Sequence, residues 1–391
     1  MNWDDIIIDA AATDTGMRRS NNQDSYMAVR ASHEESWRQR GHVFLVADGM
    51  GAHAVGELAS KMACDLIPHT YMKARTGTPS EAIVKSFREV SAQIHSRASA
   101  NRDFQGMGTT CSALLLLPTG ALVAHVGDSR VYRIRKGRID QLSFDHSLAW
   151  ELVRRNHLTS EQASLSVPKN VITRSLGPEI EIEVDIEGPL AVELGDVYLL
   201  CSDGLSGPVD DDEMGAIAAN FHPNDACRYL VSLANLRGGL DNITVVIVRI
   251  GEWVDPDSGE TLNRVPTPKH VRDRSGREGW RSRLSELVTG RRRQGSLALV
   301  EDHPYRTAEC NINETLVDRF DELTRNIQEQ AIAQAWSLDW AALATLRRQA
   351  TDARTAKNLW VSLRKAGELI FMLGQAARFY RKNAGPATPV Q

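Results

Sequence analysis

The sequence predicts an α+β fold, in which antiparallel strands and helices occupy separate layers. Short strands follow one another up to about residue 251, and the helices between them are grouped rather than strictly alternating with strands. A doubly wound parallel sheet would instead alternate strand and helix along the chain. Hydrophobic residues make up 42% of the 391 residues, which is enough for a packed core.

The expected strands are apolar or alternating runs that end at turn residues. Some alternate apolar and polar residues, as strands with one buried face do, and others are apolar throughout. The strand segments are HVFLVAD, CSALLLLP, ALVAHVGD, RVYRIRKG, DVYLLCSD and ITVVIVRI. Residues 120–143 are expected to form one antiparallel meander, with turns at Gly127-Asp128 and Lys136-Gly137.

Helical periodicity appears at four places in the same part of the chain. In residues 54–75, Leu58, Met62 and Leu66 recur on one face, which is the spacing of an amphipathic helix. Further helices are expected at residues 80–99, 211–220 and 223–236. We therefore predict one large domain over residues 1–254.

The composition changes after this domain, and residues 255–300 are expected to form a basic, flexible linker. Residues 261–294 hold ten Lys or Arg against three Asp or Glu and contain little apolar material. A solvated tether is the favoured interpretation of such a segment. The sharper alternative is an electrostatic contact with an acidic partner or with the preceding domain.

Residues 301–391 are predicted to be a helical region, either a hairpin or a small bundle. Asn311 or Asn313 can cap the first helix. Two further helices should meet near residues 355–357. These helices can pack on the first domain or form a module that recruits a protein partner, and the sequence leaves both open. The first helix carries an apolar stripe of Ile312, Leu316, Phe320, Leu323 and Ile327.

Charge and cysteine usage narrow the class of protein. A formal net charge of −4 is too mild to indicate nucleic acid or an anionic membrane as the main partner. The five cysteines form no CxxC pair, so neither a disulfide framework nor a zinc site is expected. The N-terminal residues lack a signal-peptide pattern and no apolar run is long enough to span a bilayer, so a cytoplasmic setting is expected.

Four aspartates occupy the same local context, at the tips of expected strands. Asp48, Asp128 and Asp203 each follow an apolar strand, and Asp241 directly precedes one. Carboxylates gathered at one sheet edge would repel each other unless cations compensated them. Mg²⁺ or Mn²⁺ are the natural candidates, because these ions prefer oxygen ligands.

Two such ions close together can activate a water molecule at neutral pH. Their substrate should be an anion whose oxygens also face the metals. Arg19, a few residues before Asp24, supplies a guanidinium that matches phosphate geometry. Phosphoester hydrolysis is the reaction that uses all of these parts.

Eight segments in order over residues 9–251 resemble the metal-dependent serine/threonine protein phosphatases of the type 2C (PPM) family, in its bacterial branch. The eight segments in this order are a specific signal for the family, although each segment alone is weak evidence. The resemblance implies a four-layer α-β-β-α sandwich, with two metal ions and a third, weaker one in a cleft at one end. The segments are GMRRSNNQD, VADGMGAHAVGELAS, GMGTTC, HVGDSRVYRIRKG, DHSL, NVITRSLG, LLCSDGL and LDNITVVIVRI.

The resemblance also implies a role for each matched residue. Asp48 would bridge both metals, and the Gly49 carbonyl would bind one of them. Asp203 and Asp241 would bind the other metal, and Asp128 would help Asp203 to hold the third. Arg19 would bind the substrate phosphate. Asp24 would orient metal-bound water, and Asn242 would support the site beside it.

Two positions depart from the family pattern. Ala52 stands where a second glycine is frequent, and Met50 stands where some relatives have a histidine that acts as general acid. Because Met50 cannot donate a proton, metal-bound water, His53 or His146 are the alternatives. Residues 150–182 resemble the family's mobile flap beside the cleft.

The resemblance favours a phosphoserine/phosphothreonine protein phosphatase that opposes Ser/Thr protein kinases in signalling. Two alternatives stay open at this point. One is a non-catalytic relative that works as a binding or sensing module through its C-terminal helices. The other is a two-metal phosphohydrolase that acts on nucleotides or small phosphoesters. The presence of all four aspartates together with Arg19 favours catalysis over the first alternative.

Overall fold

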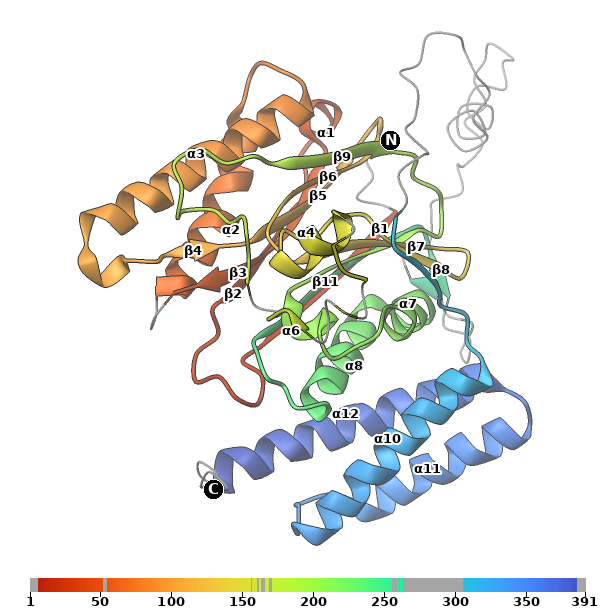
Figure 1. Cartoon of the computed structure of the whole chain (residues 1–391). Helices are drawn as coiled ribbons and strands as arrows, with labels where there is room; N and C mark the ends of the chain where they lie inside the picture. Colours follow the sequence, from red (N-terminus) through yellow and green to blue (C-terminus); the bar gives the residue numbers. More distant parts are fainter. Residues whose placement is uncertain are drawn as a thin grey trace, which may run out of the picture.

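The protein is a sandwich of two six-stranded antiparallel sheets covered on both sides by helices (Figure 1). The structure is a computed structural model, and it describes residues 6–51, 55–155, 157–159, 162, 166–168, 171–254, 259, 261–262 and 305–384. The four layers confirm the predicted α+β class. No helix in these described ranges combines the length and apolar character needed to cross a bilayer.

The first sheet carries the strands that lead to two of the aspartates. It continues into the C-terminal part of the chain, because a short strand after residue 305 pairs with its edge. Its order is β1 (Ile7–Asp14), β11 (Ile243–Ile250), β10 (Val197–Cys201), β7 (Arg130–Arg135), β8 (Arg138–Gln141) and β14 (Thr307–Glu309).

The second sheet carries Asp24 and Asp48 opposite each other on neighbouring strands. A separate two-stranded ladder joins β12 (Trp253–Val254) and β13 (Thr261–Leu262). The order of the second sheet is β2 (Asp24–Val29), β3 (His42–Met50), β5 (Cys111–Leu117), β6 (Gly120–Val126) and β9 (Asp185–Leu190), with β4 (Gly108–Thr109) pairing with β3.

The main helices lie close to their predicted ranges. Helices α2 (Val55–Lys73) and α3 (Pro79–Ala100) pack on the second sheet, and Thr78 begins α3 with a capping box. Helices α7 (Asp211–Asn220) and α8 (Pro223–Leu236) pack on the first sheet. The shorter helices are α1 (Glu34–Arg40), α4 (Leu148–Arg154), α6 (Asp203–Ser206) and the 3₁₀ turn η2 (Arg102–Phe104).

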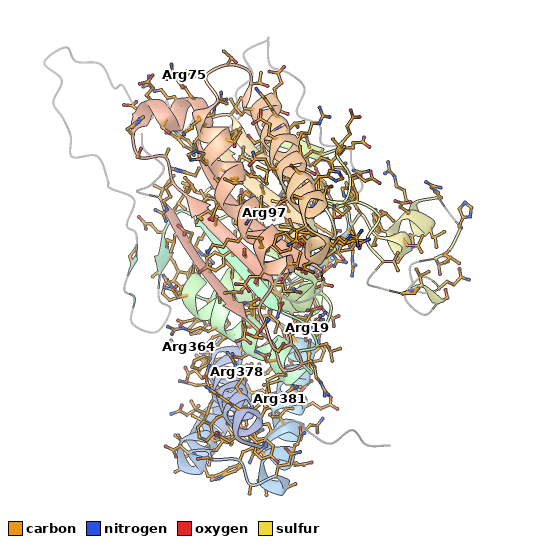
Figure 2. The ribbon with its side chains drawn as sticks, turned by 90° about the vertical axis from the view of Figure 1, so that its left-hand side faces the viewer. Arg19, Arg75, Arg97, Arg364, Arg378 and Arg381 are labelled. Carbon is orange, nitrogen blue, oxygen red and sulfur yellow. The ribbon has the colours of Figure 1, made fainter. Side chains whose placement is uncertain are left out.

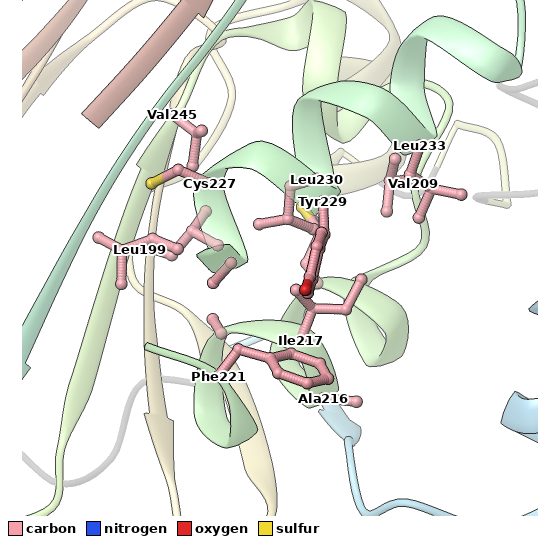
Figure 3. Packing of buried hydrophobic residues seen from close by; sticks show 14 of the residues in the cluster. Leu199, Val209, Ala216, Ile217, Phe221, Cys227, Tyr229, Leu230, Leu233 and Val245 are labelled. Atoms are coloured by element: carbon pink, nitrogen blue, oxygen red, sulfur yellow. The ribbon is translucent and has the colours of Figure 1, made fainter. Parts of the chain in front are cut away.

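Apolar side chains fill each interface between these layers. Phe44, Leu114 and Tyr198 are fully buried between the two sheets. Figure 3 shows the cluster beneath α7 and α8, where Cys227 lies beside Leu199 and Val245 of the first sheet and the Phe221 ring meets the Tyr229 ring. Such close packing makes the sandwich a rigid support for the residues at its ends.

The C-terminal helices form a three-helix bundle that packs against α8, as Figure 1 shows in blue. They are α10 (Glu314–Ala333), α11 (Trp340–Thr355) and α12 (Leu359–Ala384). Asn313 caps α10, with Leu316 N donating to its Oδ1 at 2.8 Å. Leu316 and Phe320 are buried in the same cluster as α7 and α8. The bundle therefore packs on the first domain, the first of the two arrangements left open by the sequence.

One predicted connection is wrong. Residues 120–143 do not form a single meander, because β6 belongs to the second sheet and β7 to the first. Both strands place apolar residues in the core between the sheets, and Gly127, with a φ of 116°, allows the chain to cross between the sheets. Only the β7–β8 hairpin at Lys136-Gly137 is confirmed.

Most of the predicted basic linker lies outside the described residues. The division of the chain at residues 254 and 300 stays a prediction.

Candidate metal centre and phosphate site

The four predicted aspartates meet at one end of the sandwich. Asp48 lies near the end of β3, and Asp203 begins α6 directly after β10. Asp241 lies just before β11, and Asp128 lies in the crossing between β6 and β7. The negative charges of all the others, and of Asp24, act on Asp48. The acids therefore share one site, although they come from both sheets.

Burial raises the pKa of four acids of the site, which are Asp24, Asp48, Asp128 and Asp203. Burial and then the charges of neighbouring acids raise the pKa of Asp48 well above its usual range. The same causes raise the pKa of Asp128 to about 8. Burial raises the pKa of Asp24 to about 7, and it also raises the pKa of Asp203. Such a cluster is stable in its charged form only when positive charge compensates it.

Several oxygens of the cluster fit a hard divalent cation. Oδ1 of Asp24, Asp128 and Asp203 is buried and has no hydrogen-bond partner among the described residues. Within the same described ranges, no three His, Cys, Asp or Glu side chains are already arranged as a complete ligand set. Asp203 is instead hydrogen-bonded to Asp48, and Asp241 to Arg19. The donor set nevertheless consists of carboxylate oxygens, which Mg²⁺ and Mn²⁺ prefer.

The backbone around Asp48 is held firmly in place. Asp48 N donates to Thr110 Oγ1 at 2.9 Å, and Thr110 N donates back to Asp48 O at 2.9 Å. A side chain at Gly49 would bring its Cβ within 2.0 Å of Gly56 O at the start of α2. Only glycine fits at this position, so the backbone of residue 49 packs closely against the start of α2, directly after Asp48.

Arg19 lies on the N-terminal loop, next to Asp241. Its Nη2 donates to Asp241 Oδ2 at 2.7 Å, and this hydrogen bond raises the pKa of Arg19. The Arg19 side chain is 51% exposed, so the guanidinium borders both the acid cluster and solvent. It is well placed to meet an anion that approaches the cluster.

Asn242 closes the loop that carries Arg19. Its Nδ2 donates to Thr15 O at 3.0 Å and to Asn21 O at 2.9 Å, so one amide joins both ends of the loop. Its Oδ1 accepts from Gln23 N at 2.8 Å. The structure thus brings Asn242 together with the predicted site residues as a support for the backbone.

Ser202 is a site residue that the sequence interpretation missed. Its Oγ donates to Asp24 Oδ2 at 2.7 Å and accepts from Thr244 N at 2.9 Å. The hydroxyl therefore links Asp24 of the second sheet to the strands of the first. Its only signal in the sequence is its position directly before Asp203.

His146 is buried and joins the crossing between β6 and β7 to the start of β9. Its Nδ1 accepts from Gly127 N at 3.0 Å, and its Nε2 lies 3.0 Å from Asp185 Oδ2. Burial alone would raise the pKa of Asp185, but the contacts with His146 and Arg174 lower it to about 2. His53 and Ala52 lie outside the described residues.

Comparisons with known proteins find a family match and similar sequences. Residues 17–233 match the family described as protein phosphatase 2C. The chain is 36% identical over 245 residues to the protein phosphatase PhpP of Streptococcus pneumoniae, covering 61% of this chain and 96% of that protein.

Solved structures give the same result. The serine/threonine phosphatase PstP/Ppp of Mycobacterium tuberculosis superposes with a TM-score of 0.55 at 31% identity, covering 63% of this chain and 99% of that one. The catalytic domain of the serine/threonine protein phosphatase PstP, solved in complex with two manganese ions, superposes with a TM-score of 0.53. Its identity is also 31%, and the match covers 63% of this chain and 99% of that domain.

The fold and the acid cluster define a metal-dependent phosphohydrolase, and the matches specify which kind. The chain belongs to the protein phosphatase 2C family. It is a protein-serine/threonine phosphatase that depends on divalent metal for its activity in signalling. The non-catalytic alternative is not favoured.

Proposed function

We propose that Asp48, Asp203, Asp241 and the Gly49 carbonyl hold two divalent cations, Mn²⁺ or Mg²⁺, for the hydrolysis of phosphoserine and phosphothreonine in proteins. The observation that carries this proposal is the convergence of Asp48, Asp203 and Asp241 at one end of the sandwich, where Asp203 Oδ1 is buried without a hydrogen-bond partner among the described residues. When bound, the cations supply activation of water and neutralisation of the phosphate charge.

The protein's own groups then bind and orient the substrate. Arg19 binds the phosphate oxygens, exchanging part of its contact with Asp241 for the substrate. Asp24 orients water from beneath the site and is itself held by Ser202. Asn242 keeps the Arg19 loop closed during this exchange.

We assign Asp128 to a third, weaker cation, which it shares with Asp203. In support of this role, Asp128 keeps a buried oxygen without a partner in the described part of the chain, and the Asp203 charge helps to raise its pKa. A third ion would relieve that repulsion.

Water at the site is the best donor for the leaving alcohol. Met50 has no proton to give, and both ring nitrogens of His146 have partners, which favours a role for His146 in positioning the flap. His53 remains the other candidate, outside the described residues.

The substrates proposed for this enzyme are proteins phosphorylated by Ser/Thr kinases, whose action it opposes. A reducing, cytoplasmic setting is supported by the five cysteines, which are all free and buried. A partner for the C-terminal helices stays a prediction.

The test uses the full chain, a phosphothreonine peptide and Mn²⁺. We expect hydrolysis that chelator abolishes, and a loss of at least about a thousandfold in kcat/KM for Asp48→Asn, because a ligand to both ions is weakened. Asp65→Asn, on the exposed side of α2, is the matched control and should keep the normal rate. A near-normal rate for Asp48→Asn would show that the cluster is not the catalytic centre.

A further inference from the structure

Asp14, outside the metal cluster, is a buried carboxylate that connects both ends of the chain. It ends β1, and only 5% of its surface is exposed. Its Oδ1 accepts from Gly16 N at 2.8 Å and from Asn235 Nδ2 at 3.2 Å. Its Oδ2 is bound by the guanidinium of Arg378, which belongs to α12 of the C-terminal bundle. Arg378 is thus the charge that balances Asp14.

Gly16 and Asn235, which Asp14 holds, lie on the two segments that lead to Arg19 and Asp241. Gly16 begins the loop that carries Arg19, and its φ of 77° suits glycine. A Cβ at Gly16 would lie 2.1 Å from the backbone oxygen of Asp241, so the two segments touch. Met17 N donates to Gly239 O at 2.7 Å, on the segment that joins Asn235 to Asp241. Asp14 therefore fixes the Arg19 loop and the Asp241 segment against each other.

Helix α12 reaches this place through close packing on α8. A Cβ at Gly367 would lie 2.8 Å from the Tyr229 ring, and one at Gly374 would lie 2.9 Å from Ser232 Cβ. These glycines are seven residues apart, which is two helical turns, so they share one face of α12. Arg378 follows one turn after Gly374. The small residues let the two helices approach closely and bring the guanidinium to Asp14.

A second contact between the bundle and the loop involves Met17. Its side chain packs on an apolar cluster of the bundle that contains Ala331, Trp336, Ala376 and Ala377. Arg18 lies near Arg381, one turn after Arg378. Burial, and then the charge of Arg18, lower the pKa of Arg381. Figure 2 labels Arg19, Arg378 and Arg381 at this junction between the phosphatase domain and the bundle.

We propose that Arg378 is a positioning residue for the phosphate site, acting through Asp14 on the loop that carries Arg19. This inference rests on the proposed role of Arg19 as the phosphate ligand. Arg19 is a long and half-exposed side chain, so the place of its guanidinium depends on the backbone that carries it. The C-terminal bundle is therefore part of the phosphate-binding apparatus and more than a surface for partners.

The test measures KM and kcat for a phosphothreonine peptide, together with the inhibition constant for inorganic phosphate, in the Mn²⁺-loaded full chain. Arg378→Ala should raise KM and the phosphate inhibition constant by about 5- to 20-fold, because a small misplacement of a binding group weakens its contact. The value of kcat should change less than about threefold, since the metal ligands remain. Arg378→Lys should restore part of the loss. Arg348→Ala, an exposed arginine of α11, is the control and should behave as wild type.

A double-mutant cycle separates positioning from general stability. In an Arg19→Ala background, Arg378→Ala should add less than about twofold to KM, because its effect passes through Arg19. Independent, multiplying effects, or an unchanged KM in Arg378→Ala, would overturn the proposal.

The results for folding and for Arg19→Ala alone decide how the double-mutant cycle is interpreted. If Arg378→Ala does not fold, as judged by near-ultraviolet circular dichroism, Arg378→Gln takes its place in the same cycle, with the same two outcomes, because it also removes the charge that Asp14 binds. If Arg19→Ala alone keeps a normal KM and phosphate inhibition constant, the phosphate role of Arg19 fails and the positioning role fails with it. If Arg19→Ala is impaired but shows no coupling to residue 378, only the positioning role fails.

Discussion

Two kinds of buried carboxylate occur in this protein, and their partners differ. Asp145 receives three hydrogen bonds from Arg130, at 2.9, 3.1 and 2.6 Å, and Asp14 is bound by Arg378. In contrast, Asp128 and Asp203 each keep a buried oxygen without a partner among the described residues. A paired carboxylate holds elements together, whereas an unpaired cluster needs a ligand. The difference distinguishes the acids that support the fold from those that form the metal site.

The largest expected effect comes from changing an unpaired acid of the cluster, Asp203. Asp203→Asn should lower kcat/KM for a phosphothreonine peptide by at least about a thousandfold, because it weakens one metal ligand. The thermal stability of the metal-free protein should stay within error of wild type or rise, since a charge that the Asp241 carboxylate repels is removed. Calorimetry and steady-state kinetics on one preparation check both parts. A large loss of stability would place Asp203 with the structural acids.

Asp145, which is paired with Arg130, should respond in the opposite way: its change should lower stability and leave metal binding intact. Asp145→Asn should cost about 4 kcal/mol of unfolding free energy, because it leaves the Arg130 guanidinium, whose side chain is only 16% exposed, without its carboxylate partner. Mn²⁺ affinity of the folded protein should change little. Urea unfolding measures the loss, with Asp225→Asn on the surface of α8 as the control. An unchanged unfolding free energy would remove the distinction between the two kinds of acid.

A smaller effect concerns pH and the buried His125. Burial, and then the nearby His146, lower its pKa from 6.5 to about 4. Above pH 6.5 the ring is neutral in both folded and unfolded chains. As pH falls from 6.5 to 4, the unfolded chain binds the proton first, so folding loses about 3 kcal/mol from this group.

The test compares unfolding free energies at pH 6.5 and pH 4. His125→Gln should lose about 3 kcal/mol less than wild type over this interval. His69→Gln, on the exposed face of α2, should show the full wild-type loss. An equal loss of unfolding free energy in wild type and His125→Gln would contradict the buried, neutral state of the ring.

The sequence predicted the features that depend on local pattern. Acids after apolar strands identified Asp48, Asp128 and Asp203, and helical periodicity with a capping residue identified α10 and Asn313. The resemblance to a known family then supplied the sandwich and the role of each acid, which the local pattern alone left open.

The features that the sequence did not predict depend on long-range contacts. The alternation of apolar and polar residues predicts that β6 and β7 are strands. It does not show that they lie in different sheets. Arg378 resembles an ordinary helix-surface charge, and its partner Asp14 is 364 residues earlier in the chain. Ser202 resembles a turn residue until both of its hydrogen bonds are known.

The most direct test of the central claim is calorimetric titration of the metal-free full chain with Mn²⁺. We predict binding of two tight ions per chain in the wild type, and loss of this binding in Asp48→Asn while Asp145→Asn keeps it in its folded fraction. Wild-type binding by Asp48→Asn would contradict the account, because the strand-tip carboxylates would then not hold the cations.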